Sequence, residues 1–146
     1  MSLNHQEKQE QMQFEELIQG LIDNEYGCCN DFILPETVMG LGANIKRLNE
    51  SGNMKPAGIG NQVISQKDSN IRGDKINWIE ELSSNAFEAV YINKMVRFIN
   101  HLNKTCFTSI KGFESHYANY GLKSFYKRHF DQFKTEKEES IHWFYI

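Results

Sequence analysis

The stretch SFYKRHFDQF, Ser124 to Phe133, is expected to form an extended strand at the centre of a sheet. Side chains two positions apart on a strand point to the same face, so His129 and Asp131 are expected to lie side by side. An imidazole and a carboxylate so placed can reach one metal ion, and this ligand pair suits iron, manganese or zinc. A strand with one polar face would show the same pattern, so the neighbouring sequence has to distinguish the two.

Further strands are predicted on both sides of this stretch. An aromatic-rich run from Phe113 to Tyr120 precedes it, and Gly121 to Ser124 is predicted to be the turn between them. After it, a charged turn from Lys134 to Ser140 leads to a last apolar run, Ile141 to Ile146.

Two shorter strands are predicted upstream, at Gln62 to Ser65 and Lys75 to Ile79, joined by the polar segment Gln66 to Asp74. A mobile element that covers a substrate would sit in a loop of this kind, although plain surface loops are commoner. The tripeptide Arg72-Gly73-Asp74 within it is not interpreted as an adhesion motif, because nothing in the sequence indicates an extracellular protein.

Two helices are predicted near the N-terminus. The first runs from Gln6 to Asn24 on the three- and four-residue spacing of its apolar residues, with Gly27 as its stop. A short strand is expected from Cys28 to Ile33. The second helix runs from Pro35 to Asn49, and proline suits the first position of a helix.

A third helix is predicted up to Asn103, capped by Ser83 or Ser84. Its buried face is expected to hold Phe87, Tyr91, Met95, Phe98 and Leu102. Helices first and strands last indicate an α+β fold, with the helices packed on a largely antiparallel sheet.

Composition limits the classes of protein to consider. A single domain over residues 1–146 is predicted, since a chain of this length can bury a working core. A net charge of −3 without a long basic block gives no reason to expect a nucleic-acid partner. No apolar run approaches the roughly 20 residues that span a membrane, and the polar N-terminus does not resemble a signal peptide. Cys28, Cys29 and Cys106 form no disulfide framework, so a reduced, cytoplasmic setting is expected.

Three motifs carry a resemblance to a known family. The run NQVISQKDSNIRGDKINWIE, Asn61 to Glu80, resembles the strand–loop–strand of the prolyl hydroxylases that act on the hypoxia-inducible transcription factor. MKPAGIG, Met54 to Gly60, and FESHYANYGLKSFYKRHFDQF, Phe113 to Phe133, resemble the bacterial relatives of those enzymes. The motifs occur in the family's order, so the chain looks like a 2-oxoglutarate- and Fe(II)-dependent dioxygenase of the prolyl 4-hydroxylase type.

This resemblance implies a double-stranded β-helix (jelly-roll) core, flanked by the N-terminal helices. It implies that His129 and Asp131 bind Fe(II), and that Tyr120 hydrogen-bonds the co-substrate 2-oxoglutarate, with Tyr145 a looser match nearby. Arg72 and Asp74 would belong to a loop that closes over a protein or peptide substrate. The implied reaction is hydroxylation of a prolyl residue with oxidative decarboxylation of 2-oxoglutarate to succinate, supported by ascorbate.

The sequence departs from the family pattern in two places. Tyr120 is followed by Gly121-Leu122-Lys123, without the usual proline. Family members continue into strands that carry a distal histidine and a basic residue for 2-oxoglutarate, so the C-terminal strands of the jelly roll are expected to be missing here. His142 and His116 are the candidates for a replacement third ligand.

The alternative is a non-catalytic remnant or peptide-binding module that lacks the distal histidine and the basic residue for the co-substrate. If the missing strands are needed, a partner chain that supplies them is the main way in which catalysis could survive.

Overall fold

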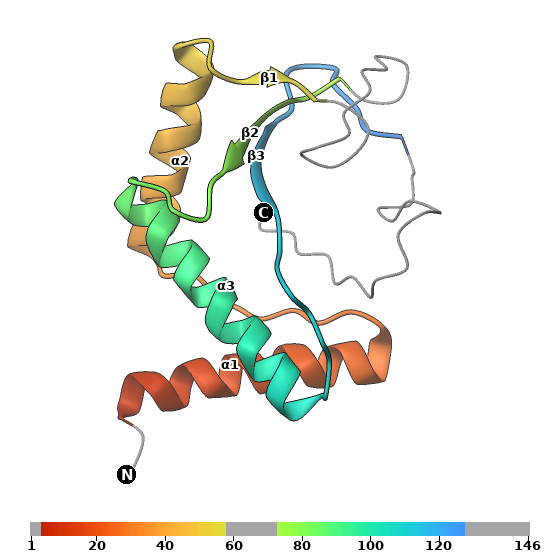
Figure 1. Cartoon of the computed structure of the whole chain (residues 1–146). Coiled ribbons are helices and arrows are strands. Elements are labelled where there is room, and N and C mark those ends of the chain that lie inside the picture. Colours follow the sequence, from red (N-terminus) through yellow and green to blue (C-terminus); the bar gives the residue numbers. More distant parts are fainter. Residues whose placement is uncertain (1–3, 58–72, 128–146) are drawn as a thin grey trace. The chain divides into compact units, whose positions relative to one another are not determined.

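A computed structural model describes residues 4–57 and 73–127 of the chain, and these form three helices and three strands (Figure 1). The helices are α1 (His5–Asn24), α2 (Pro35–Glu50) and α3 (Ala86–Thr105), and the strands are β1 (Lys55–Pro56), β2 (Lys75–Ile79) and β3 (Ser115–Asn119). The α+β class predicted from the sequence is therefore confirmed. Within the described ranges, no helix combines the length and the apolar character that crossing a bilayer requires.

The chain divides into two compact units. The first unit contains α1, the beginning of α2 and the whole of α3, in residues Met1–Leu41 and Ser84–Ser109. The second contains the rest of α2 and the sheet, in residues Gly42–Ser83 and Ile110–Ile146. A single domain over residues 1–146 stays a prediction.

The core of the first unit is a cluster of aromatic side chains between α1 and α3. Phe98 of α3 is fully buried, and its ring meets that of Phe14 of α1 edge-on at 5.0 Å between centroids. The ring of Phe32 packs on Phe98 from the segment between α1 and α2, at 6.1 Å. Such edge-to-face pairs add about 0.5–1.5 kcal/mol each to the burial of the rings. The predicted apolar faces of the first and third helices thus meet in one core.

The cap of α3 and the segment before α2 differ from the predictions. The N-cap of α3 is Asn85, whose side-chain oxygen accepts hydrogen bonds from the backbone N–H groups of Phe87 and Glu88, and not Ser83 or Ser84. Phe87, in the first turn of this helix, is 41% exposed, in contrast to its predicted burial.

The predicted strand from Cys28 to Ile33 is a turn. Asp31 has a left-handed backbone (φ 54°), which interrupts any extended run. The turn lets both Phe32 and Ile33 be buried, although neighbouring residues on a strand would point to opposite faces. A turn, and not a strand, is therefore the conformation that suits the burial of both Phe32 and Ile33.

Both ends of α1 have defined caps. Asn4 and Glu7 form a reciprocal capping box at the start of the helix. The helix ends at Asn24, which confirms its predicted last residue, and the left-handed residue that follows is Glu25 (φ 66°), two positions before the Gly27 that was predicted as the stop. Gly27 has another role, because a Cβ on it would collide with the backbone of Leu17 in α1. The chain after α1 can fold back against the helix only with glycine at this position.

Polar pairs on the surface of the first unit also join α1 to α3. The guanidinium of Arg97 donates to both carboxylate oxygens of Glu10, at 2.6 and 2.8 Å, and this hydrogen bonding lowers the pKa of Glu10. Lys94 donates to Gln13 at 2.7 Å, and burial lowers the pKa of its ammonium group. Burial raises the pKa of the Cys29 thiol to about 11, which favours its protonated form at neutral pH.

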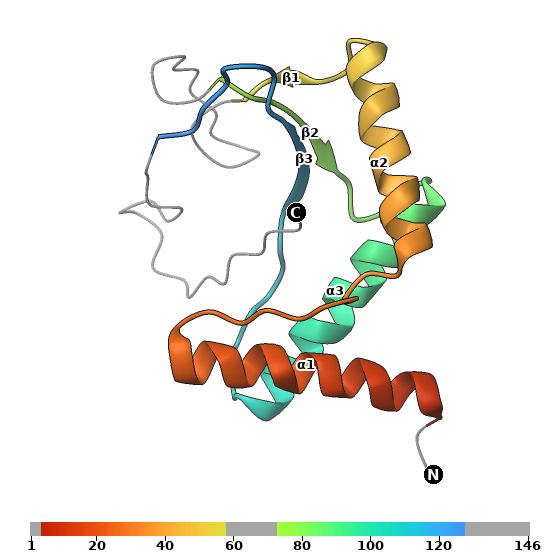
Figure 2. The same cartoon turned by 180° about the vertical axis from the view of Figure 1, so that it is seen from behind.

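The second unit is built on a three-stranded antiparallel sheet in the order β1–β2–β3, which Figure 2 shows from behind. The β2–β3 ladder pairs Lys75 with Asn119 at one end and Ile79 with Ser115 at the other. The predicted strand from Lys75 to Ile79 is confirmed residue for residue, and the one predicted from Phe113 to Tyr120 is confirmed with slightly shorter bounds. The strand predicted from Gln62 to Ser65 lies outside the described residues.

Candidate functional site

The structure describes two of the predicted site residues, Asp74 and Tyr120. The predicted iron ligands His129 and Asp131 lie outside the described residues, and their roles stay predictions. The same holds for Arg72 in the predicted substrate loop and for Tyr145. Asp74, Tyr120 and the residues that contact the chain around them form the described part of the candidate site.

Three segments of the chain meet at Gly73 and Asp74, immediately before β2. On one side, the backbone N–H of Ala57 donates to the carbonyl oxygen of Asp74 at 2.9 Å. On the other side, the N–H of Gly73 donates to the carbonyl oxygen of Phe125 at 2.9 Å, and the Oγ of Ser124 donates to the carbonyl oxygen of Gly73 at 3.1 Å. The start of the stretch SFYKRHFDQF is thus hydrogen-bonded to the Arg-Gly-Asp segment, far away in the sequence.

A tight turn positions the start of that stretch. The N–H of Ser124 donates to the carbonyl oxygen of Gly121 at 2.9 Å, and Lys123 has a left-handed backbone (φ 66°). The predicted turn from Gly121 to Ser124 is therefore confirmed. The turn reverses the chain directly after Tyr120, and Phe125 returns beside Gly73.

The two faces of the β2–β3 ladder differ in what they contact. Tyr117 of β3 is buried on one face, where its hydroxyl accepts a hydrogen bond from the side-chain amide of Asn44 in α2 at 3.2 Å. Arg47 in turn donates to the amide oxygen of Asn44 at 2.7 Å. The face that carries Tyr117 is therefore the face that α2 covers.

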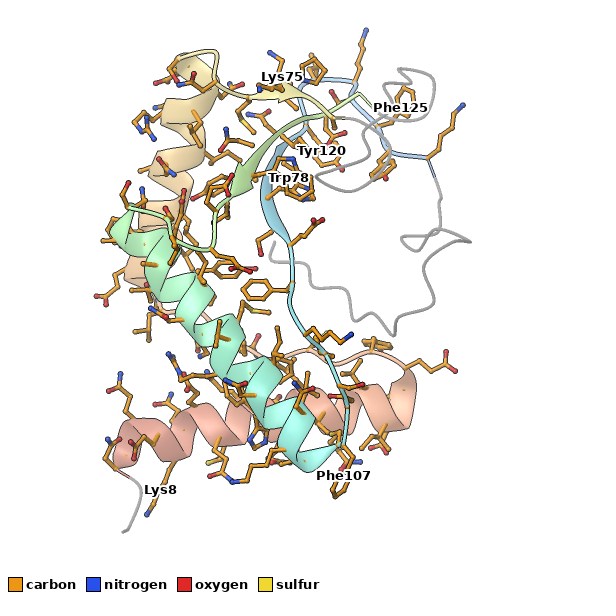
Figure 3. The ribbon with its side chains drawn as sticks, in the orientation of Figure 1. Lys8, Lys75, Trp78, Phe107, Tyr120 and Phe125 are labelled. Atoms are coloured by element: carbon orange, nitrogen blue, oxygen red, sulfur yellow. The ribbon has the colours of Figure 1, made fainter. Side chains whose placement is uncertain are left out.

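The opposite face, here called the tryptophan face, carries Ile76 and Trp78 of β2 opposite Ala118 and His116 of β3. The same alternation, continued by one residue beyond the strands, assigns Asp74 and Tyr120 to this face as well. The side chains of Trp78 and Tyr120 are labelled in Figure 3.

Asp74 and Tyr120 have very different environments at the same end of the ladder. Asp74 is 2% exposed, whereas Tyr120 is 50% exposed. A buried carboxylate needs polar partners to offset its lost hydration, so Asp74 is suited to holding the segment before β2 in place. Tyr120 keeps its ring accessible and is suited to contacting a bound molecule.

His116, one of the two candidate replacement ligands, lies on the tryptophan face in cross-strand pairing with Trp78. Their ring centroids are 5.1 Å apart and the rings are inclined at 69°. His142, the other candidate, lies outside the described residues. Among residues 4–57 and 73–127, no group of three His, Cys, Asp or Glu side chains is placed to hold a metal ion.

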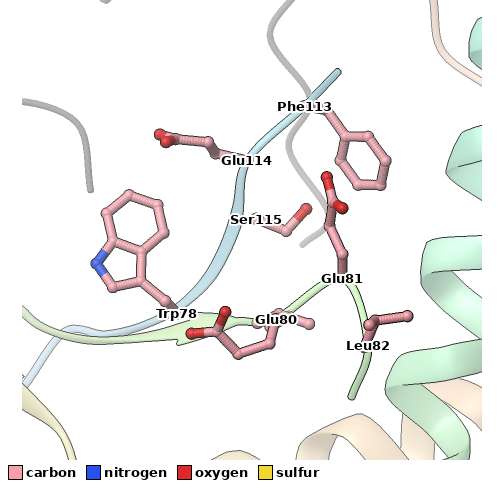
Figure 4. Close-up of a pocket in the computed structure, with 8 residues that line it drawn as sticks. Trp78, Glu80, Glu81, Leu82, Phe113, Glu114 and Ser115 are labelled. Carbon is pink, nitrogen blue, oxygen red and sulfur yellow. The ribbon is translucent and has the colours of Figure 1, made fainter. Parts of the chain in front are cut away.

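A pocket that the sequence patterns did not indicate lies at the opposite end of the ladder from Asp74. Its volume is about 410 Å³, and residues 78–82 and 113–115 line it (Figure 4). Trp78 is on its wall, with the carboxylates of Glu80, Glu81 and Glu114. The run NWIEE, with paired acidic residues just after a strand, is the signal in the sequence that could have drawn attention to this pocket.

Comparison with known proteins finds similarity among solved structures. No family model matches the sequence, and no curated protein matches it. The structure is similar to a crystal structure of a prolyl-4-hydroxylase from Pseudomonas putida, with a TM-score of 0.71 and 27% sequence identity over 82% of this chain. The chain spans 61% of the length of that structure, to which it is similar in fold.

Proposed function

We propose that this chain provides part of a non-haem Fe(II)- and 2-oxoglutarate-dependent dioxygenase centre of the prolyl-hydroxylase type. The observation that carries the proposal is the fold similarity to the bacterial prolyl-4-hydroxylase over 82% of the chain. The motifs around His129, Asp131 and the Arg-Gly-Asp segment support it from the sequence. Because the chain spans 61% of that structure's length, the activity, the jelly-roll core and the substrate are part of the proposal.

The donor set of the proposed metal site suits iron. His129 offers an imidazole nitrogen and Asp131 a carboxylate oxygen, the types of ligand that Fe(II) takes in the oxygenases that use two histidines and one carboxylate. When bound, the iron with 2-oxoglutarate and O₂ supplies the oxidation of an unactivated C–H bond, and ascorbate is expected to support it. A third protein ligand and a basic anchor for 2-oxoglutarate are not assigned.

The described residues would position the parts of this centre. Hydrogen bonds from Gly73 and Ser124 connect the segment of the predicted substrate loop to the start of the predicted metal strand. A shift of one would therefore be transmitted to the other through two direct contacts. Asp74 is buried at this junction, and its carbonyl oxygen, immediately before β2, accepts a hydrogen bond from the N–H of Ala57.

Tyr120 is proposed to hydrogen-bond the co-substrate. Its ring is half-exposed, and it lies one residue beyond β3, next to the turn that leads to Ser124. A phenolic hydroxyl can donate to a carboxylate without adding a charge, which suits a site that binds an anionic keto acid. The protein or peptide substrate would approach over the Arg72–Asp74 segment.

The test is an anaerobic titration of the chain with Fe(II) and 2-oxoglutarate, monitored by visible absorption. The expected result is a metal-to-ligand charge-transfer band, together with 2-oxoglutarate-dependent succinate formation in air. His129→Ala is expected to abolish the band by removing a ligand. His5→Ala changes an exposed histidine at the start of α1 and is expected to leave the band unchanged.

If neither a band nor succinate is produced, the chain alone does not form the dioxygenase centre. Binding of proline-containing peptides in that case would favour the alternative, a peptide-binding module without turnover.

A further inference from the structure

The pocket at the Ile79 and Ser115 end of the β2–β3 ladder is lined by a large aromatic ring and several carboxylates. Its volume of about 410 Å³ falls within the usual range of ligand pockets, about 300–1,000 Å³. It lies at the other end of the ladder from Asp74 and Tyr120, so the proposed co-substrate site does not use it.

The indole of Trp78 is held in place on the wall of this pocket. The ring of His116, from the opposite strand, meets it at 69° and 5.1 Å between centroids. Trp78 is only partly buried, so part of the ring stays accessible. A cation over the face of a tryptophan is attracted by the ring's quadrupole, more strongly than over tyrosine or phenylalanine.

The charges around the ring have one sign. Glu80, Glu81 and Glu114 line the pocket, and no lysine, arginine or histidine from the described part of the chain lines it with them. Within residues 4–57 and 73–127, none of these three carboxylates has an ion-pair partner. An anionic ligand would be repelled, and a cation would meet both the ring and the carboxylates.

We propose that this pocket binds an arginine or lysine side chain of the peptide substrate. The inference rests on the proposed function and adds a substrate class to it: a target proline with a basic residue in the same extended segment. The four steps of β2 from Lys75 to Ile79 correspond to about 13 Å at 3.3 Å per residue. A basic residue about four positions from the proline would therefore span from the Asp74 end of the ladder to the pocket.

The experiment is fluorescence anisotropy of the full chain with labelled synthetic peptides, without metal or 2-oxoglutarate. One peptide contains a proline and an arginine about four residues away, and a matched peptide has glutamine in place of arginine. We expect the arginine peptide to bind about tenfold more tightly, and the difference to shrink as salt is raised. Glu80→Gln combined with Glu114→Gln should remove most of this preference and leave the glutamine peptide unaffected.

A matched control replaces carboxylates away from the pocket, Asp23→Asn with Glu50→Gln. This control is expected to keep the preference for arginine. Equal binding of the two peptides, or an equal loss in the pocket variant and the control, would overturn the proposal.

A third peptide, with alanine in place of proline, separates this proposal from the proposed function. If that peptide still binds in an arginine-dependent way, and the chain forms no succinate, the pocket proposal is supported and the proposed dioxygenase function is contradicted. If succinate forms equally with the arginine and glutamine peptides, the dioxygenase function is supported and the pocket proposal is contradicted.

Discussion

Glu10 and Arg97 show how single residues connect α1 to α3. Glu10 is only partly exposed, and its two oxygens each accept a hydrogen bond from the Arg97 guanidinium. Two parallel hydrogen bonds of this kind are stronger and more specific than a single contact between charges. The exposed pair of Lys46 and Glu50 on α2, with 3.9 Å between Nζ and Oε1, is expected to stabilise the fold less, because solvent screens the two charges.

The lowered pKa of Glu10 predicts a dependence of stability on pH. A carboxyl with a lowered pKa in the folded state stabilises the fold above its ordinary value of 4.5, and this contribution is lost as the pH falls through the lowered value. Glu10→Gln is therefore expected to lower the free energy of unfolding by about 0.5–1 kcal/mol at neutral pH, and by less as the solution becomes acidic. Urea denaturation of both proteins from pH 7 to pH 3 measures the difference.

Glu50→Gln is the matched control, since it removes a glutamate from an exposed ion pair. It should change the stability by a few tenths of a kcal/mol at most. An effect of Glu10→Gln that is equal at all pH values would contradict the assignment to the ion pair.

Asp74 and Tyr120 were selected as site residues from the sequence, but their burial was not predicted. The motif resemblance selected both, and the structure places them at the same end of the β2–β3 ladder. That one of them is buried and the other half-exposed was not predicted. Exposure depends on which other segments cover a side chain, and Ser124 and Phe125 reach Gly73 only after the chain has turned.

At the scale of elements, two glycines differ in the space that a Cβ atom would find: Gly27, which follows α1, and Gly42, which lies inside α2. Gly27 packs so closely on Leu17 that a Cβ would overlap backbone atoms, which cannot rotate away. Gly42, inside α2, has open space where its Cβ would be. The same substitution is therefore expected to have opposite signs at the two positions.

Gly27→Ala is expected to reduce the free energy of unfolding by about 1–3 kcal/mol, because the segment after α1 must move away from the helix. Gly42→Ala is expected to increase it by about 0.5–1 kcal/mol, because alanine loses less entropy in a helix and meets no neighbour. Thermal and urea denaturation, followed by circular dichroism, measure both changes. Similar effects of the two variants would show that the close approach at Gly27 is not required.

The helix and strand positions were largely predictable, and their ends less so. The spacing of apolar residues located all three helices, and β2 was predicted with its observed bounds. The cap of α3 was misplaced because Ser83, Ser84 and Asn85 are all good caps, and sequence alone does not rank them. The turn around Asp31 was missed because burial of both Phe32 and Ile33 arises only when Phe14 and Phe98 are brought together.

At the scale of the whole molecule, the metal prediction can be tested through thermal stability. A ligand that binds only the folded state raises the melting temperature with its concentration. Mn(II) is therefore expected to raise the melting temperature by about 2–6 °C at concentrations well above its dissociation constant. Asp131→Ala should abolish this rise.

His5→Ala is again the matched control and should keep the full rise. If Asp131→Ala and the unaltered chain respond equally to Mn(II), the ion binds elsewhere and the pair of His129 and Asp131 is not its site. Calorimetry with increasing Mn(II) distinguishes these outcomes without requiring turnover.

The sequence by itself determined the α+β class, the helix and strand positions, and the candidate ligands His129 and Asp131, because these depend on local spacing and on motifs. Only the tertiary structure joined Gly73 to Ser124 and Phe125, brought the hydroxyl of Tyr117 to Asn44 of α2, and placed Trp78 and Glu114 in the lining of one pocket. The physical reason is that antiparallel pairing of β2 with β3 brings together residues that are far apart in the sequence, such as Lys75 and Asn119, and the register selects which of them share a face.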